Sequence, residues 1–169
     1  MLKVLYKSLK TGCLTESLPD RNKTDESLGS DVHQEIRRIL GKSLAIRMVD
    51  AGSCNGCELE MHAVTNCIYD IERFGIHFVA SPRHADLLLV TGPVSRHMQA
   101  ALKRTYDAMP APKLVIAMGD CGADGGEFGV SYASCGAVAN VIPVDAVIRG
   151  CPPNPRQLLT GILALLRRG

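Results

Sequence analysis

The sequence predicts an α/β fold built on a doubly wound parallel sheet. From residue 44 onward, short apolar runs alternate with segments whose apolar residues recur at helical spacing. Such alternation is typical of parallel sheets with helices on both faces. The chain has 169 residues, which is the size of one domain that can bury a core without disulfide staples. No internal repeat is visible.

The region before the first expected strand differs in texture. Residues 1–42 mix charges and turn formers, and "DVHQEIRRILGK" at residues 31–42 indicates a short amphipathic helix. We interpret residues 1–42 as an N-terminal extension that contacts a partner or a membrane surface, and residues 43–169 as the domain. A partly disordered tail is the alternative that the composition leaves open.

The remaining elements follow from local periodicity. Short apolar runs predict strands at residues 44–49, 76–81, 85–92, 113–119 and 140–145. Helical spacing predicts helices at residues 56–74, 95–109 and 155–168. In the last of these, Pro155 near the start and Arg167 and Arg168 in the final turn suit helix ends. In the first, Leu59, Ala63, Cys67 and Ile71 are expected to share one apolar face.

Charge and hydropathy exclude several classes of protein. A net charge of +2 and the absence of Lys/Arg-rich runs interleaved with aromatic residues argue against nucleic-acid binding. The N-terminus "MLKVLYKSLKTG" has neither a secretory signal nor a twin-arginine motif, and no apolar run reaches the roughly 20 residues that cross a bilayer. We therefore expect a cytoplasmic chain that meets a membrane only through partners or surface contact.

Seven cysteines are many for a cytoplasmic chain of this size, and in a reducing compartment clustered cysteines indicate metal or redox chemistry. Cys54 and Cys57 follow the first expected strand, Cys121 follows the fourth, and Cys151 follows the last. Sites in parallel sheets form beyond the carboxyl ends of the strands. The sequence therefore predicts that these four thiols share one site.

The residues around these cysteines favour an iron–sulfur cluster. The segments "GSCNGC", "GDCGADGG" and "RGCPP" place glycine beside every candidate ligand, which allows the close backbone approach and N–H donors that cluster sulfur atoms need. Zinc sites usually draw two short cysteine pairs, and a redox dithiol needs no third or fourth cysteine. The C-x2-C…C…C-P pattern fits neither well, although both alternatives stay open.

The three other cysteines have simpler interpretations. Cys67 is expected in the core, because free cysteine packs as a small apolar residue. Cys13 belongs to the extension and has no expected role. Cys135, in "YASCGAV", competes with Cys121 for a ligand position.

Four segments carry a family resemblance: "CNGCELE", "SPRHADLLLVTGPVSR", "GDCGADGG" and "IPVDAVIRGCPPNP". They resemble the small electron-transfer subunit of membrane-bound [NiFe] hydrogenases of the formate-hydrogenlyase and energy-converting type. The same superfamily includes the subunit of respiratory complex I that holds the [4Fe–4S] cluster nearest the quinone. The resemblance runs from about residue 43 to the end. It implies a flavodoxin-like fold and one [4Fe–4S] cluster with Cys54, Cys57, Cys121 and Cys151 as ligands.

The details of the resemblance favour the hydrogenase branch. The complex I version has "CC" at the first ligands, whereas this chain has Cys54-Asn-Gly-Cys57. The leader and the extra cysteine-rich segments of periplasmic uptake hydrogenases are not seen. The resemblance thus implies one cluster and a location on the cytoplasmic face of the membrane.

The resemblance also implies a role and partners. The chain is expected to be a subunit of an oxidoreductase complex that passes electrons and performs no bond chemistry alone. Its implied partners are a large [NiFe]-type subunit, a ferredoxin-like subunit with two [4Fe–4S] clusters, and integral membrane subunits. The alternatives are the quinone-proximal cluster subunit of a complex I-type NADH:quinone oxidoreductase, a nickel-free hydrogenase-derived redox complex, and a structural protein that holds zinc or no metal.

Three polar residues follow Cys57 at the expected start of a helix. Glu58 and Glu60 suit a helix N-terminus electrostatically, which is a sufficient structural reason for both. Glu60 also matches "C-x-x-E" in both branches of the resembling family, which implies a proton relay or tuning of the cluster. His62 is of the residue type that most readily exchanges protons in proteins, so either role fits it, and simple exposure on the helix is the alternative. Arg83 and His84 are expected in a solvated loop, with contact to a partner or a quinone-like headgroup as the alternative.

Overall fold

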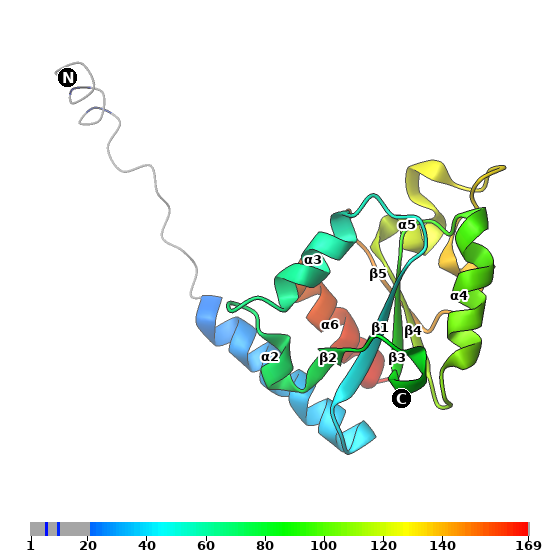
Figure 1. The fold of residues 1–169 in the computed structure, drawn as a ribbon. Coiled ribbons are helices and arrows are strands. Elements are labelled where there is room, and N and C mark those ends of the chain that lie inside the picture. Colours follow the sequence, from blue (N-terminus) through cyan, green and yellow to red (C-terminus); the bar gives the residue numbers. More distant parts are fainter. Residues whose placement is uncertain (1–5, 7–9, 11–20, 169) are drawn as a thin grey trace.

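A computed structural model describes Tyr6, Lys10 and residues 21–168, with side chains described for Tyr6, Lys10 and from Glu26 onward. Its sheet has five strands, all parallel, in the order β2-β1-β3-β4-β5 (Figure 1). This confirms the expected doubly wound sheet, and the order is that of flavodoxin-like folds. The strands are β1 (Leu44–Asp50), β2 (Ile76–Phe78), β3 (Leu87–Thr91), β4 (Leu114–Met118) and β5 (Ala146–Ile148).

Helices cover both faces of the sheet (Figure 1). Because side chains alternate along a strand, Leu87 and Leu89 of β3 join one core cluster, whereas Leu88 and Val90 join another. The first cluster lies under α2, α3 and α6, and the second lies under α4. The α-helices are α2 (Arg21–Leu40), α3 (Gly56–Val64), α4 (Arg96–Ala108), α5 (Gly119–Asp124) and α6 (Pro155–Leu166). None of the helices within the described residues is long and apolar enough to span a bilayer.

The helix α2 belongs to the core of the domain. It begins at Arg21, earlier than the helix predicted at residues 31–42, and it packs against α6. Val32 and Ile36 are 0% and 1% exposed and lie in the first core cluster. The second half of the predicted extension is therefore a structural layer of this chain, and contact of residues 1–42 with a partner or a membrane stays a prediction.

The predicted helix at 56–74 is wrong beyond Val64. The side chain of Asn66 accepts hydrogen bonds from the N–H groups of Ile68 and Tyr69, at 2.8 and 3.1 Å, which holds a turn in place of another helical turn. As a result Cys67 is exposed, not buried in the core as predicted. Leu59, placed on the same predicted face, is 62% exposed.

The fifth strand was also misplaced. It runs over Ala146–Ile148, directly after the predicted segment 140–145. Pro143 has no N–H to donate to a ladder, and residues 138–140 form a 3-10 turn. Pairing begins only at Asp145, whose N–H donates to the carbonyl of Val115 at 2.9 Å. Cys151 consequently lies three residues beyond the strand end, closer to the carboxyl edge than expected.

Candidate functional site

Four cysteines converge at the carboxyl edge of the sheet. Cys54 lies in the loop after β1, Cys57 in the first turn of α3, Cys121 in α5 after β4, and Cys151 just after β5. Their electrostatic effects on one another show how close they lie. Burial raises the pKa of the Cys57 thiol to about 12, with further increases from Glu58, Cys54, Cys121 and Cys151 in that order.

The pKa of Cys121, the other partly buried thiol, is raised by burial and by neighbouring cysteines of the same set. Burial raises the pKa of Cys121, and the charges of Cys151 and Cys54 raise it further, followed by those of Asp120 and Asp124. Cys54 and Cys151 are both exposed, whereas Cys57 and Cys121 are partly buried. Two thiols therefore face solvent or a partner, and two lie deeper in the protein.

Main-chain contacts hold the cysteine-bearing loops side by side. The N–H of Asp120 donates to the carbonyl of Gly150 at 3.0 Å, and the N–H of Gly150 donates to the Asp120 carboxylate at 3.2 Å. These two bonds join the residues that directly precede Cys121 and Cys151. On the other side, a methyl group on Gly56 would lie 3.6 Å from Cys54 Sγ and 3.7 Å from Cδ of Pro152, so those two loops adjoin as well.

Glycine at two positions makes room for sulfur. A Cβ atom on Gly119 would lie 2.8 Å from Cys57 Sγ, and one on Gly126 would lie 2.9 Å from Cys121 Sγ. Both residues also have positive φ, +85° and +51°, which side chains other than glycine adopt at a cost. The backbone thus approaches the two deeper thiols more closely than any other residue type would allow.

Glu58 lies where the strand order reverses, and it bridges the loop after β1 and the end of β3. It is 6% exposed. Its carboxylate accepts a 2.6 Å hydrogen bond from Ser53 Oγ and another from the hydroxyl of Thr91, the last residue of β3. Thr91 is itself fully buried. Glu58 therefore anchors the start of α3, and with it Cys57, to the loop after β1 and to the end of β3.

The other predicted polar residues lie farther from this centre. Glu60 is partly buried on α3, and His62 is exposed on the same helix, where it lines a cavity. Arg83 and His84 lie in a 3-10 turn before the amino end of β3, whereas the cysteines lie past carboxyl ends. Neither residue belongs to the cysteine cluster.

The remaining cysteines also lie apart from the cluster. Cys135 is buried in the second core cluster, beneath α4, and its N–H donates to the carbonyl of Val94 at 2.7 Å. It is not among the groups that shift the pKa of Cys57 or Cys121. Cys67 is exposed beyond α3, and Cys13 lies outside the described residues.

The chemistry of the donor set fits an iron–sulfur cluster, which is held by cysteine thiolates. Within the described part of the chain, no group of three or more His, Cys, Asp or Glu side chains is arranged around one metal ion. A four-iron cluster takes one thiolate at each iron, so its ligands stand farther apart than the ligands of a single zinc ion. Four converging thiols, with glycine where a Cβ would crowd two of the sulfurs, suit the larger group.

Sequence reasoning missed three supporting residues. Ser53 and Thr91 hold Glu58, and Arg149 Nη1 lies 2.7 Å from Asp124 Oδ2 and 3.8 Å from Asp120 Oδ1. Asp124 and Arg149 are therefore stabilised in their charged forms, with the pKa of Asp124 lowered and that of Arg149 raised. One signal was present in the sequence: Thr91 is the only polar residue of an otherwise apolar strand.

Known proteins share both sequence and fold with this chain. Residues 54–165 match the family described as the NADH ubiquinone oxidoreductase 20-kDa subunit. Formate hydrogenlyase subunit 7 of Escherichia coli is 43% identical over 84% of this chain, which spans 55% of that relative's length. A probable membrane-bound hydrogenase subunit of Pyrococcus furiosus is 42% identical over 79% of this chain and 80% of its own length.

A solved structure agrees with these matches. A chain in the structure of the membrane-bound sulfane sulfur reductase, an archaeal respiratory membrane complex, is 36% identical with a TM-score of 0.66. The match covers 81% of this chain and 74% of the other. The family match begins at Cys54 and includes all four converging cysteines. The chain belongs to the family of the NADH ubiquinone oxidoreductase 20-kDa subunit.

Proposed function

We propose that the chain is the electron-transfer subunit of a membrane-bound hydrogenase or complex I-like complex, and that it carries one [4Fe–4S] cluster on Cys54, Cys57, Cys121 and Cys151. The observation that carries this proposal is the convergence of these four thiols, from three separate loops, at one edge of the sheet. A cluster held by four thiolates supplies one-electron transfer.

The residues of this chain bind and shield such a group. Gly119 and Gly126 leave space at the two deeper sulfurs, and the contacts between Asp120 and Gly150 keep two ligand loops together. Burial of Cys57 and Cys121 excludes water from one side of the site. The exposed Cys54 and Cys151 leave the opposite side open to a partner, as electron transfer between subunits requires.

The acidic residues of α3 support the site differently. Glu58 is held by two hydroxyl donors beside Cys57 and, after burial, raises the pKa of that thiol electrostatically, so it is placed to tune the site. Glu60 and His62, placed toward the outer part of α3, remain candidates for proton transfer to a partner. Both roles are part of the proposal.

We propose partners of the kind found in hydrogenase complexes: a large [NiFe]-type subunit, a ferredoxin-like subunit with two [4Fe–4S] clusters, and integral membrane subunits. The names of the two hydrogenase relatives support this assignment. The overall reaction would be 2 H⁺ + 2 e⁻ ⇌ H₂, carried out at the large subunit. The chain would lie on the cytoplasmic face, bound to the membrane through these partners.

A second candidate is a nickel-free respiratory complex or a complex I-type enzyme. The matched family takes its name from NADH ubiquinone oxidoreductase, and the matched solved structure is a sulfane sulfur reductase. Metal analysis of the purified complex separates the two candidates, because only the hydrogenase contains nickel. Hydrogen-dependent reduction of a dye by the nickel-containing complex would support the first candidate.

The ligand assignment is tested by electron paramagnetic resonance of the dithionite-reduced chain after reconstitution with iron and sulfide. Cys121→Ser and Cys151→Ser are expected to lose or alter the cluster signal, because each removes one thiolate. Cys135→Ser and Cys67→Ser are matched controls that are expected to keep it. Loss of the signal in Cys135→Ser together with its retention in Cys121→Ser would refute the proposed ligand set.

A further inference from the structure

The first strand of the sheet has an open edge over its second half. Pairing with β2 ends at Ile46 and Phe78, whereas pairing with β3 continues to Asp50. Residues 47–50 are therefore paired on one side only. Parallel sheets are normally covered on both faces, and an uncovered strand edge is a template for pairing with another chain.

Main-chain groups of β1 point toward this open edge. The N–H of Leu44 donates to Gly75 and the carbonyl of Ile46 accepts from Val79, both on the β2 side, at 2.8 and 2.9 Å. Because the direction alternates along a strand, the main chains of Met48 and Asp50 face the same side. At about 3.3 Å per residue, residues 47–50 offer an edge roughly 13 Å long.

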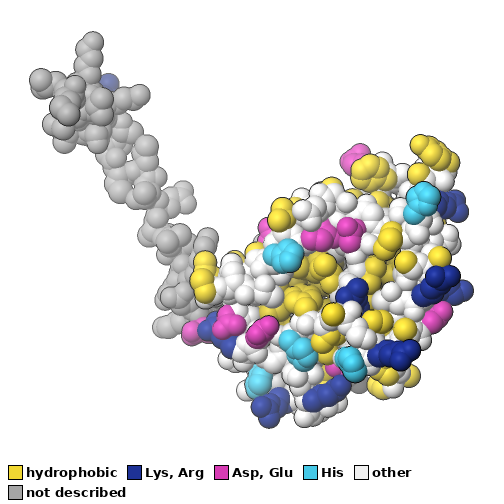
Figure 2. Space-filling view, viewed as in Figure 1, with side chains coloured by type: hydrophobic (Ala, Val, Ile, Leu, Met, Phe, Trp, Pro, Cys, Tyr) yellow, Lys and Arg dark blue, Asp and Glu magenta, His cyan; other side chains and the backbone are white. Residues whose placement is uncertain are grey.

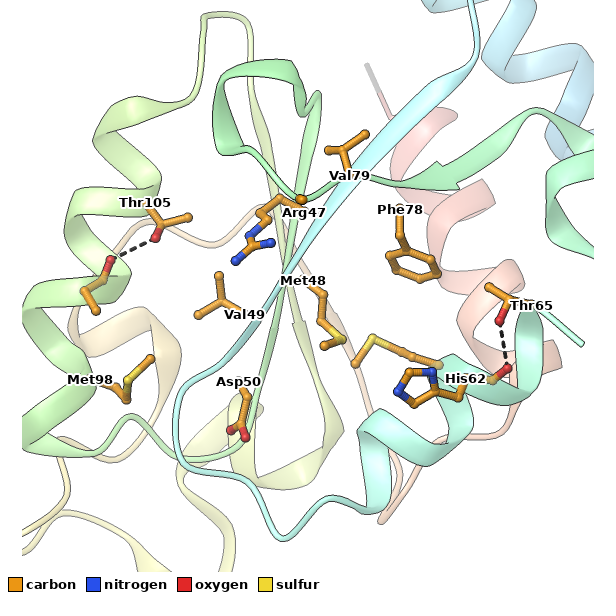
Figure 3. Close-up of a pocket in the computed structure, with 13 residues that line it drawn as sticks. Arg47, Met48, Val49, Asp50, His62, Thr65, Phe78, Val79, Met98 and Thr105 are labelled. Carbon is orange, nitrogen blue, oxygen red and sulfur yellow. Dashed lines mark hydrogen bonds between the residues drawn. The ribbon is translucent and has the colours of Figure 1, made fainter.

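A cavity of about 690 Å³ lies along this edge, between α3 and α4. Figure 3 shows Met48 and Phe78 on its α3 side and Val49 and Met98 toward α4. Apolar side chains also gather between these helices on the molecular surface (Figure 2). The connection from β2 to β3 contains only a three-residue 3-10 turn, Pro82–His84, so no helix of that connection covers the groove.

One cation points into this groove with a nitrogen that is unsatisfied within the described part of the chain. Figure 3 shows the guanidinium of Arg47 directed into the space between β1 and α4. Its Nε atom is buried and has no hydrogen-bond acceptor among the described residues. Asp50, at the other end of the groove, uses Oδ1 to accept the N–H groups of Gly52 and Ser53 at 2.8 Å. A buried guanidinium N–H left without an acceptor is costly, so the groove calls for an acceptor from beyond the described residues.

We propose that an extended segment of a partner subunit adds to the open edge of β1 at residues 47–50 and places a carboxylate against Arg47. Main-chain hydrogen bonds to Met48 and Asp50 would give the segment its register, and apolar side chains on either side of its carboxylate would fill the groove. The inference rests on the proposed function only in requiring a partner subunit.

The test uses the complex purified with its partner subunits. A photo-crosslinking amino acid replaces Ala80, an exposed residue that lines the groove, and the crosslinked peptide is identified by mass spectrometry. We expect one segment of one partner subunit, with an acidic residue flanked by apolar ones. Its yield should fall about tenfold or more in Arg47→Glu, since the carboxylate would then face a like charge. Arg104→Glu, on α4 and outside the groove, is the control and should keep the yield.

Two further measurements keep the proposal falsifiable. Reversing the charge of the identified acidic residue should restore the crosslink in Arg47→Glu. If Arg47→Glu prevents assembly of the complex, Arg47→Met is used in its place and should weaken the crosslink. Hydrogen exchange at residues 47–50 should be slow in the intact complex and faster in the variant. Crosslinks to lipid, to a small molecule or to scattered surfaces, or fast exchange of these amides in the intact complex, would overturn the proposal. The cluster signal should persist in Arg47→Glu, which separates this test from that of the proposed function.

Discussion

Gly119→Ala tests whether the close approach of backbone to Cys57 is required by the site. The new Cβ would lie 2.8 Å from Cys57 Sγ, whereas comfortable contacts need about 3.5–4.0 Å. The sulfur must then move by roughly 1 Å, whereas metal–ligand distances in a formed site vary by only about 0.2 Å. We therefore expect the variant to lose most of its iron even where the chain still folds.

The same substitution should also destabilise the fold. An alanine at φ +85° costs about 1–2 kcal/mol in backbone conformation, and overpacking adds about 1–3 kcal/mol. The free energy of unfolding of the metal-free chain should thus fall by about 2–5 kcal/mol. Urea unfolding followed by circular dichroism measures this change, and iron and sulfide analysis after reconstitution measures occupancy.

Two glycine controls separate the cost of the backbone conformation from the steric contact with Cys57. Gly41 also has positive φ, +64°, but has nothing within 4 Å of a built Cβ, so Gly41→Ala should show the backbone cost alone and keep its iron. Gly122 lies in α5 without positive φ, and its Cβ would meet Ala117 at an ordinary 3.6 Å. Gly122→Ala should be near neutral. Full iron content in Gly119→Ala would refute the reasoning, because Cys57 would then tolerate a displaced position.

Three other predictions concern the hydroxyl group of Thr91 that binds Glu58, the packing of α2, and the thiol of Cys57. Thr91→Val removes a hydroxyl donor from the buried Glu58 at unchanged volume, so unfolding free energy should fall by about 1.5–3 kcal/mol. Ile36→Ala empties a site that is 1% exposed and should cost about 2–5 kcal/mol. In the metal-free chain, burial raises the pKa of Cys57 from 9.0 to about 12, so its alkylation should stay slow at pH 9 and accelerate toward pH 12. The folded chain then holds this proton more tightly than the unfolded one, and the stability from this group is present below pH 9 and is lost between pH 9 and about 12.

Matched controls exist for each of these changes. Thr105→Val removes a hydroxyl that donates to its own helix at Ala101, so its effect on unfolding should stay within about 0.5 kcal/mol. Ile39→Ala lies on the same helix as Ile36 but at a site 37% exposed, and should cost far less. Equal effects for the two isoleucines would contradict the packing of α2. Alkylation of Cys57 as fast in the native as in the urea-unfolded chain at pH 9 would contradict the raised pKa.

Local pattern was sufficient for most of the fold. The runs at residues 85–92 and 113–119 are largely apolar, and they form β3 and β4, two of the interior strands of the sheet. The strand β5 was misplaced because its apolar run, Ala146–Ile148, is only three residues long and comes one residue after the other apolar residues at 141–144, where the sequence predicts the strand. The end of α3 was missed because one side chain, that of Asn66, redirects the chain against an otherwise helical pattern.

For the candidate site too, some features could be predicted from the sequence and others depend on contacts between distant residues. Chain order alone placed the four cysteines at one edge, because every strand of a parallel sheet ends there. The hydrogen bond from Thr91 to Glu58 could not be predicted from local sequence. Thr91 lies 33 residues away and contacts Glu58 only because β1 and β3 are neighbours in the sheet. The lack of an acceptor for Arg47 Nε among the described residues could not be predicted from the sequence either, because the open edge beside it depends on where β2 ends.

Two independent devices fix the two halves of the site. The Cys57 half depends on Glu58, which accepts hydrogen bonds from Ser53 in the loop after β1 and from Thr91 at the end of β3. The half with Cys121 and Cys151 depends on reciprocal main-chain bonds between Asp120 and Gly150. Because the two sets of contacts share no residue, loss of one should leave the other half in place. Each half contributes two of the four cysteines, so a bound cluster would link the two halves covalently. Loss of the cluster should therefore make the carboxyl edge more mobile than the rest of the sheet.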